Sequence, residues 1–128
     1  MSTYKIVIPG NTPSLKNSKQ MVMTGDKPRL ISSKTYRNWM PGALYQLNTS
    51  PLVGKKWSYP LRISFHFIRD SRRKFDFINA AQGPCDLLIQ AGIIEDDDML
   101  HLIPGEFSYQ VGPKESACCI LTITEVEA

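Results

Sequence analysis

Long apolar runs and paired cysteines are scarce in this 128-residue chain. No apolar run approaches the roughly 20 residues that cross a bilayer, so we expect no membrane span. The opening segment MSTYKIVIPG alternates like a β-strand and lacks the apolar core of a signal peptide. The three cysteines are odd in number, and the side chains of the adjacent Cys118 and Cys119 would point to opposite faces of a strand. These features disfavour a disulfide framework and predict a cytoplasmic protein.

Acidic side chains are nearly absent from the first part of the chain. Residues 1–75 carry 14 of the 15 Lys and Arg residues but two acids, Asp26 and Asp70, whereas residues 76–128 carry ten acids and one base, Lys114. The formal net charge of +3 therefore hides a basic part with a balance of +12 and an acidic part with a balance of −9. A basic region beside a carboxylate cluster suits a metal-dependent enzyme that acts on a polyanion.

Short periodic segments separated by turn residues predict the strands. Alternating apolar residues indicate strands over residues 4–8, 20–23, 29–31, 61–69, 107–111 and 118–124. The segment LRISFHFIR (61–69) has the clearest alternation, with Leu61, Ile63, Phe65, Phe67 and Arg69 on one side. A Gly112-Pro113 turn is expected to join the last two strands.

Two helices are expected between these strands. The first should begin after an N-cap at Ser32 or Ser33 and end near residue 47, and the second should run from Asp76 to about residue 90. Pro41-Gly42 and Gly83-Pro84 predict a kink or break in each, and Gly92 is a natural C-terminal cap. The mixed order predicts one small α+β (mixed α/β) domain in which two main helices pack on a mixed β-sheet.

Carboxylate and amide side chains recur along the second predicted helix. At 100° per residue, these side chains are expected to share one stripe of the helix surface, unless Gly83-Pro84 changes the phase; they are Asp76, Asn79, Gln82 and Asp86. The acidic run EDDD (95–98) follows a tight turn and is placed to fold back towards Asp76. Oxygen ligands of this kind suit Mg²⁺. The alternative is that the run is a solvated turn, that Asp76 merely caps the helix and that Asp86 is an exposed charge.

The segment SRRKFDFINAAQGPCDLLIQAGIIEDDDML (71–100) resembles the signature of RusA-type Holliday-junction endonucleases. Laid on without gaps, that signature matches Asp76, Asn79, Asp86, Leu88, Ala91-Gly92 and Asp96-Asp97. The opening STYKIVIPG, a loop with Pro13, Ser14 and Asn17, and the closing LTITE look like the family's start and final strand. The resemblance therefore covers nearly the whole chain and is densest over residues 72–98.

The resemblance implies a homodimeric, metal-dependent nuclease that nicks four-way DNA junctions and needs no organic cofactor. Asp76 and Asp97 carry over as the catalytic, metal-binding aspartates, Asp86 also matches, and Asp96 is a further candidate ligand. The implied metal is Mg²⁺, with Mn²⁺ as the alternative, and Asn79 and Gln82 would support the site. The family's second aspartate falls on Ile78 and its lysine falls on Gln82, which predicts weakened or lost cleavage.

Basic side chains near the motif are candidates for contacts to DNA phosphates, which give affinity without reading sequence. These candidates are Lys16, Lys19, Arg72, Arg73 and Lys74. Two rival interpretations remain open. One is a junction-binding protein that has lost cleavage, and the other is a non-enzymatic protein whose opposed charges drive association.

Four aromatic or imidazole side chains near these motifs are expected to be structural. Phe75 and Phe77 flank Asp76 and are expected to pack in the core, with stacking on an unpaired base as the alternative. His66 and His101 lie in or beside apolar strands and are expected to have no catalytic role.

Overall fold

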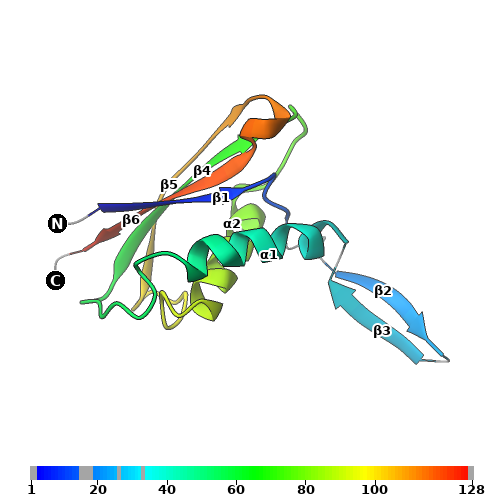
Figure 1. The fold of residues 1–128 in the computed structure, drawn as a ribbon, viewed down its shortest axis with the longest axis horizontal. Coiled ribbons are helices and arrows are strands. Elements are labelled where there is room, and N and C mark those ends of the chain that lie inside the picture. The colour runs from blue at the N-terminus through cyan, green and yellow to red at the C-terminus, as the bar shows by residue number, and fades with distance from the viewer. Residues whose placement is uncertain (1–2, 15–18, 26, 33, 127–128) are drawn as a thin grey trace.

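In the computed structural model, two helices lie against one face of a four-stranded sheet, and a two-stranded hairpin projects from this body (Figure 1). The structure describes residues 3–14, 19–25, 27–32 and 34–126. The sheet contains β1 (Thr3–Pro9), β4 (Leu61–Arg69), β5 (Leu102–Val111) and β6 (Cys118–Glu125). The helices are α1 (Lys34–Asn48) and α2 (Phe77–Gln90), and the hairpin is β2 (Lys19–Thr24) with β3 (Lys27–Ser32). The predicted α+β domain with two helices on a mixed sheet is confirmed.

The four strands are ordered β1-β6-β4-β5. β6 pairs antiparallel with both β1 and β4, whereas β5 pairs parallel with β4. A parallel pair needs a crossover connection, and α2 provides it between β4 and β5. The last two strands are joined through Gly112-Pro113 and the short 3₁₀ turn η2 (Lys114–Ser116), but β4 lies between them, so they do not form a hairpin.

The core lies between the sheet and the two helices. β4 contributes Leu61, Ile63, Phe65 and Phe67, all at most 2% exposed, which confirms the predicted alternation. α1 buries Trp39, Ala43 and Leu47 against the same core, and α2 buries residues along most of its length. Cys119 is fully buried and Cys118 half-buried, as opposite faces of β6 require, and both thiols are free.

Both helices continue past their internal prolines, so neither predicted break is present. Pro41 lies within α1 and Pro84 within α2. Around Pro84 the helix is held by packing, because residues on both sides of it are buried and Gly83 lies directly against the ring of Trp39 on α1. Tertiary contacts here outweigh the local cost of a missing N–H. Of the residues described, none belongs to a helix long and apolar enough to cross a bilayer.

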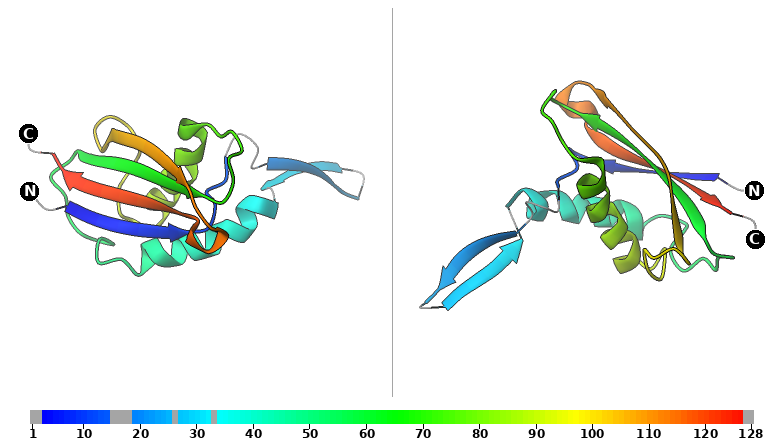
Figure 2. Two further views of the ribbon diagram at one scale, coloured as in Figure 1. Left: turned by 90° about the horizontal axis from the view of Figure 1, so that it is seen from above. Right: turned by 180° about the vertical axis from the view of Figure 1, so that it is seen from behind.

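The end of α2 turns the chain into the acidic run. Gly92 has φ +78°, a left-handed conformation that favours glycine, and confirms the predicted cap. The N–H of Gly92 donates to Ile89 O at 3.0 Å, and that of Ile93 donates to Leu88 O at 3.0 Å. Figure 2 shows that this end of α2 lies away from the projecting hairpin, which extends beyond the start of α1.

Candidate metal site and nucleic-acid cleft

Asp76 is the N-cap of α2. Its backbone is extended (φ −106°, ψ 120°), and its Oδ1 accepts hydrogen bonds from Ile78 N at 2.9 Å and Asn79 N at 3.4 Å. The helix dipole also favours a negative charge at this end. Asp76 therefore caps the helix, and capping uses one carboxylate oxygen and leaves the other available to a ligand.

A cleft of about 1400 Å³ opens beside the N-terminus of α2. We call it the α2 cleft. Its walls come from the loop after β1, the end of β4, the following basic turn, the first turn of α2, and single residues of α1 and β5: Asn11 to Ser14, Thr35, Arg69 to Ser71, Arg73 to Ala80 and Phe107. The cleft therefore brings Asp76 and Asn79 together with three basic side chains.

The basic side chains of the α2 cleft are Arg69, Arg73 and Lys74. Between the described residues there is no ion pair to any of the three, although Asp70 and Asp76 line the same cleft. Arg72 is exposed but is not among the lining residues. Lys16 and the side chain of Lys19 lie outside the described residues. The predicted DNA-contact set is thus represented in the cleft by Arg73 and Lys74, and Arg69 joins them.

The aromatic wall of the α2 cleft belongs to the core. Phe75 and Phe77 are partly buried and pack against core residues, as expected. Their ring centres lie 5.2 Å apart, and Phe77 also contacts Phe107 at 5.9 Å. The segment that carries Asp76 is therefore anchored on both sides, which constrains the backbone at Asp76.

The three aspartates of the acidic run differ in their local hydrogen bonds. Asp96 Oδ1 accepts from the N–H of Asp97 at 2.8 Å, and Asp98 Oδ1 accepts from the N–H of Leu100 at 3.0 Å. The carboxylate of Asp97 has no hydrogen bond or ion pair to another described residue. Of the three aspartates, Asp97 is thus the one in which neither carboxylate oxygen is bonded to another described residue.

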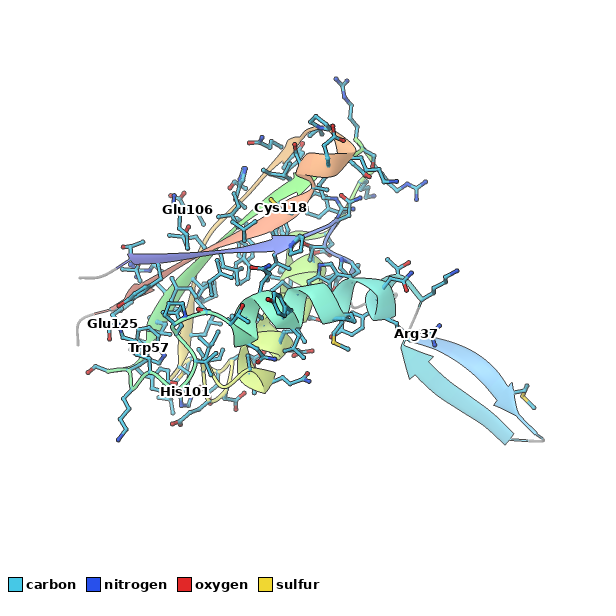
Figure 3. The ribbon with its side chains drawn as sticks, in the orientation of Figure 1. Arg37, Trp57, His101, Glu106, Cys118 and Glu125 are labelled. Atoms are coloured by element: carbon cyan, nitrogen blue, oxygen red, sulfur yellow. The ribbon has the colours of Figure 1, made fainter. Side chains whose placement is uncertain are left out.

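His101 contacts two acidic side chains of this loop. Its Nδ1 lies 2.6 Å from Asp98 Oδ1 and its Nε2 lies 3.3 Å from Glu95 Oε2. The hydrogen bond to Asp98 raises the pKa of His101, and the same bond lowers the pKa of Asp98. Figure 3 shows His101 at the end of the molecule opposite Arg37 and the hairpin. His101 therefore has a structural role, whereas His66 lies on the sheet face away from the helices, beside Ser108 and Gln110.

Asp97 lines a second, smaller pocket of about 320 Å³ on the flank of α2. We call it the Asp97 pocket, and Gln82 and Cys85 also line it. Ile78 and Phe107 belong to both the Asp97 pocket and the α2 cleft. Asp76 and Asp97 therefore open on adjoining hollows, and the side chain of Ile78, which is 67% exposed, stands between them.

Asp86 lies further along α2 and lines neither hollow. Its negative charge acts on Tyr36 of α1, whose pKa is raised first by burial and then by Asp86. Burial raises the pKa of the Cys85 thiol to about 12, and the charges of Asp97 and then Asp86 contribute to that shift. The charge of Asp86 is therefore felt by Tyr36 on α1 and by Cys85.

The oxygen donors suit a hard cation such as Mg²⁺. Within the described part of the chain, no group of three or more His, Cys, Asp or Glu side chains lies close enough to hold a metal ion. Mg²⁺ is usually bound by one or two carboxylates together with phosphate and water oxygens. Asp76 and Asp97, with the amide oxygens of Asn79 and Gln82, fit that smaller requirement. Asp96 has one carboxylate oxygen bonded to the backbone and lines neither hollow.

Two features of the site are not among the sequence-predicted site residues. Arg69 occupies the next position of the core-facing series Leu61 to Phe67. A charged residue at a position that the alternation assigns to the core is the sequence feature that could have identified it. The contacts of His101 with Glu95 and Asp98 had no comparable signal in the spacing of the residues.

No family model matches the chain, and no curated protein matches it. The likeness to RusA-type nucleases accordingly rests on the motif residues and stays a prediction.

Proposed function

We propose that this protein is a divalent-metal-dependent endonuclease that nicks branched DNA, with four-way junctions as the substrate class. One observation carries the proposal: Asp76 and Asp97 open on adjoining hollows beside basic side chains that lack an acidic partner among the described residues. The basic lining suits a phosphodiester backbone, and the two carboxylates suit one metal ion held next to it.

In this proposal Asp76 and Asp97 together hold one Mg²⁺, for which Mn²⁺ can substitute. The ion supplies charge neutralisation at the phosphate and lowers the pKa of an attacking water. Asn79 orients groups at the Asp76 end through its amide, and Gln82 does so at the Asp97 end. Arg73 and Lys74 bind the phosphate backbone and hold the strand in the cleft.

Cys85 takes no part in the chemistry, although it lines the Asp97 pocket. Its pKa of about 12 keeps the thiol protonated at neutral pH. A protonated thiol is a poor nucleophile and a poor metal ligand. The carboxylate of Asp97 is therefore the chemically competent group of this pocket.

Two further parts of the proposal concern assembly and location. Two symmetric nicks across a junction require two sites related by a two-fold axis, so a homodimer is proposed. A cytoplasmic location is proposed with it, because the three cysteines are free and a reducing compartment keeps thiols in that state.

A second candidate function is junction binding without cleavage. Ile78 favours it, because an apolar side chain occupies the wall between the two hollows, where the RusA-like signature has an aspartate. The neutral Gln82 likewise stands where that signature has a lysine. Binding through Arg73 and Lys74 does not depend on either position.

A nicking assay on a labelled four-way junction separates these candidates. We expect nicking by the purified protein in Mg²⁺, none in a chelator, and none by Asp97→Asn. Glu115→Gln is the matched control, because it removes an exposed carboxylate on η2 and should leave nicking unchanged. Tight binding without nicking would support the junction-binding candidate. Salt-sensitive self-association without DNA binding would instead support the charge-driven interaction protein.

A further inference from the structure

Arg69 is a cationic residue at the end of a core strand. It is the last residue of β4 and continues the side of the strand that buries Phe65 and Phe67. Its Nη1 donates to the carbonyl oxygen of Thr12 at 2.7 Å, and its guanidinium carbon lies 4.6 Å from the ring centre of Phe75. The side chain is therefore held in one orientation, at the edge of the α2 cleft that it lines.

The charge of Arg69 has no close counterion within the described structure. No carboxylate there lies within the 4.0 Å of an ion pair, and Nε is buried without a hydrogen-bond partner. Burial lowers the pKa of Arg69, and the charge of Asp70 opposes that shift. A partly desolvated guanidinium is stabilised by an incoming anion, because the anion replaces lost solvation and accepts hydrogen bonds from the guanidinium N–H groups that face the cleft.

We propose that Arg69 is a DNA-binding residue that holds one backbone phosphate inside the α2 cleft. This inference rests on the proposed function and specifies one substrate contact within it. The guanidinium presents its donors in a fixed fork that matches phosphate oxygens, and one of these donors is committed to Thr12. Arg69 is pre-oriented by Thr12 and Phe75, whereas Arg73 and Lys74 are exposed at the rim.

The chain offers a matched control for this contact. Arg62 lies on the same strand, and its exposed side chain points to the opposite face of the sheet from the cleft. Arg69→Met and Arg62→Met each remove one positive charge from β4 and keep an unbranched apolar side chain. Their comparison therefore separates a specific phosphate contact from a change in net charge.

The test measures binding of a fluorescent four-way junction by anisotropy, in a chelator, over a range of NaCl concentrations. Each phosphate contact contributes about 0.9 to the slope of log affinity against log salt on duplex DNA, and about 0.7 on single strands. We expect Arg69→Met to reduce this slope by the contribution of about one phosphate contact, and to weaken binding about tenfold at about 0.15 M salt. Arg69→Lys should keep the slope and bind more weakly than wild type, because it keeps the charge and loses the fork. Arg62→Met should match wild type.

Urea unfolding of each variant shows whether it is folded, and Arg69→Lys carries the test if Arg69→Met is not. A folded Arg69→Met with the wild-type slope and affinity would overturn the inference and leave the proposed function standing. Equal losses in Arg69→Met and Arg62→Met would also overturn it, since they would report net charge alone. Arg69→Lys with wild-type affinity would remove the fork argument. If the wild-type protein binds no junction DNA, the proposed function fails together with the inference.

Discussion

Asp76 has two roles in this account, and asparagine and alanine separate them. Its Oδ1 caps α2 through Ile78 N and Asn79 N, and its remaining oxygen is proposed to bind metal. Asn keeps a side-chain oxygen that can cap a helix but lacks the negative charge. Ala removes both the cap and the charge. Asp76→Asn should therefore isolate the loss of the metal ligand.

The expected magnitudes follow from the two hydrogen bonds. The 2.9 Å bond is of ordinary length and the 3.4 Å bond is long, so the cap is mainly one good bond. Asp76→Ala should then lower the free energy of unfolding by about 1 kcal/mol. Asp76→Asn should lower it by about 0.3–0.5 kcal/mol, through the lost charge at an exposed helix N-terminus. For a chain of this size, about 1 kcal/mol corresponds to about 3–5 °C in Tm.

Urea unfolding in a chelator measures the structural role, and nicking of a labelled junction in Mg²⁺ measures the catalytic one. We expect both variants to lose nicking, and Asp76→Ala alone to lose most of the capping energy. Wild-type nicking by Asp76→Asn would refute the metal-ligand role and leave Asp76 as a helix cap. Equal destabilisation by the two substitutions would refute the capping argument.

Three further predictions concern other parts of the fold. Ile78→Asp with Gln82→Lys should raise the nicking rate at least about tenfold, because it restores an acid between the two hollows and a base beside Asp97; an unchanged rate would show that these positions do not limit cleavage. His101→Gln should lower the urea midpoint at pH 6, and by less at pH 9. The pKa of His101 is raised above its unfolded value of 6.5, so the stabilisation by His101 is present below pH 6.5 and is lost as the pH rises through the folded pKa. An equal deficit at both pH values would contradict this argument. Gly105→Ala should cost about 1–3 kcal/mol in urea unfolding, since its Cβ would lie 2.2 Å from Ser64 Oγ and 3.2 Å from Ile63 O; an unchanged midpoint would contradict the clash.

Local patterns in the chain predicted the elements better than their arrangement. The alternation of residues 61–69 identified β4 and its buried side, and Gly92 identified the end of α2. The position of β5 beside β4 depends on pairing between residues about forty positions apart, such as Leu61 and Leu102. No local periodicity encodes such a pair, so the expected turn between the last two strands was compatible with several sheet orders.

The prolines show a second limit of local reasoning. Pro84 removes one helical hydrogen bond, but the helix around it buries Ala80, Ala81, Leu87 and Leu88 in the core. Those buried side chains hold the helix together across the defect. The stabilisation comes from contacts with the sheet and α1, which local sequence patterns do not describe.

The residue types of the site could be predicted from the sequence, but the role of each residue could not. The motif singled out Asp76 and the aspartates at 96–98, and both regions line or border the hollows beside α2. The loop distinguishes the three aspartates, because backbone N–H groups bond one oxygen of Asp96 and one of Asp98, while Asp97 lines a pocket. The candidacy of Arg69 depends on the loop at Thr12, whose carbonyl oxygen orients the guanidinium.

Isothermal titration of Mn²⁺ into the DNA-free protein tests most directly whether Asp76 and Asp97 hold one shared ion. The wild-type protein and Glu115→Gln should each bind one ion with the same affinity. Asp76→Asn and Asp97→Asn should each abolish that binding, because either carboxylate alone is insufficient. Wild-type Mn²⁺ affinity in both single variants, or no binding by the wild-type protein, would contradict the proposed metal site.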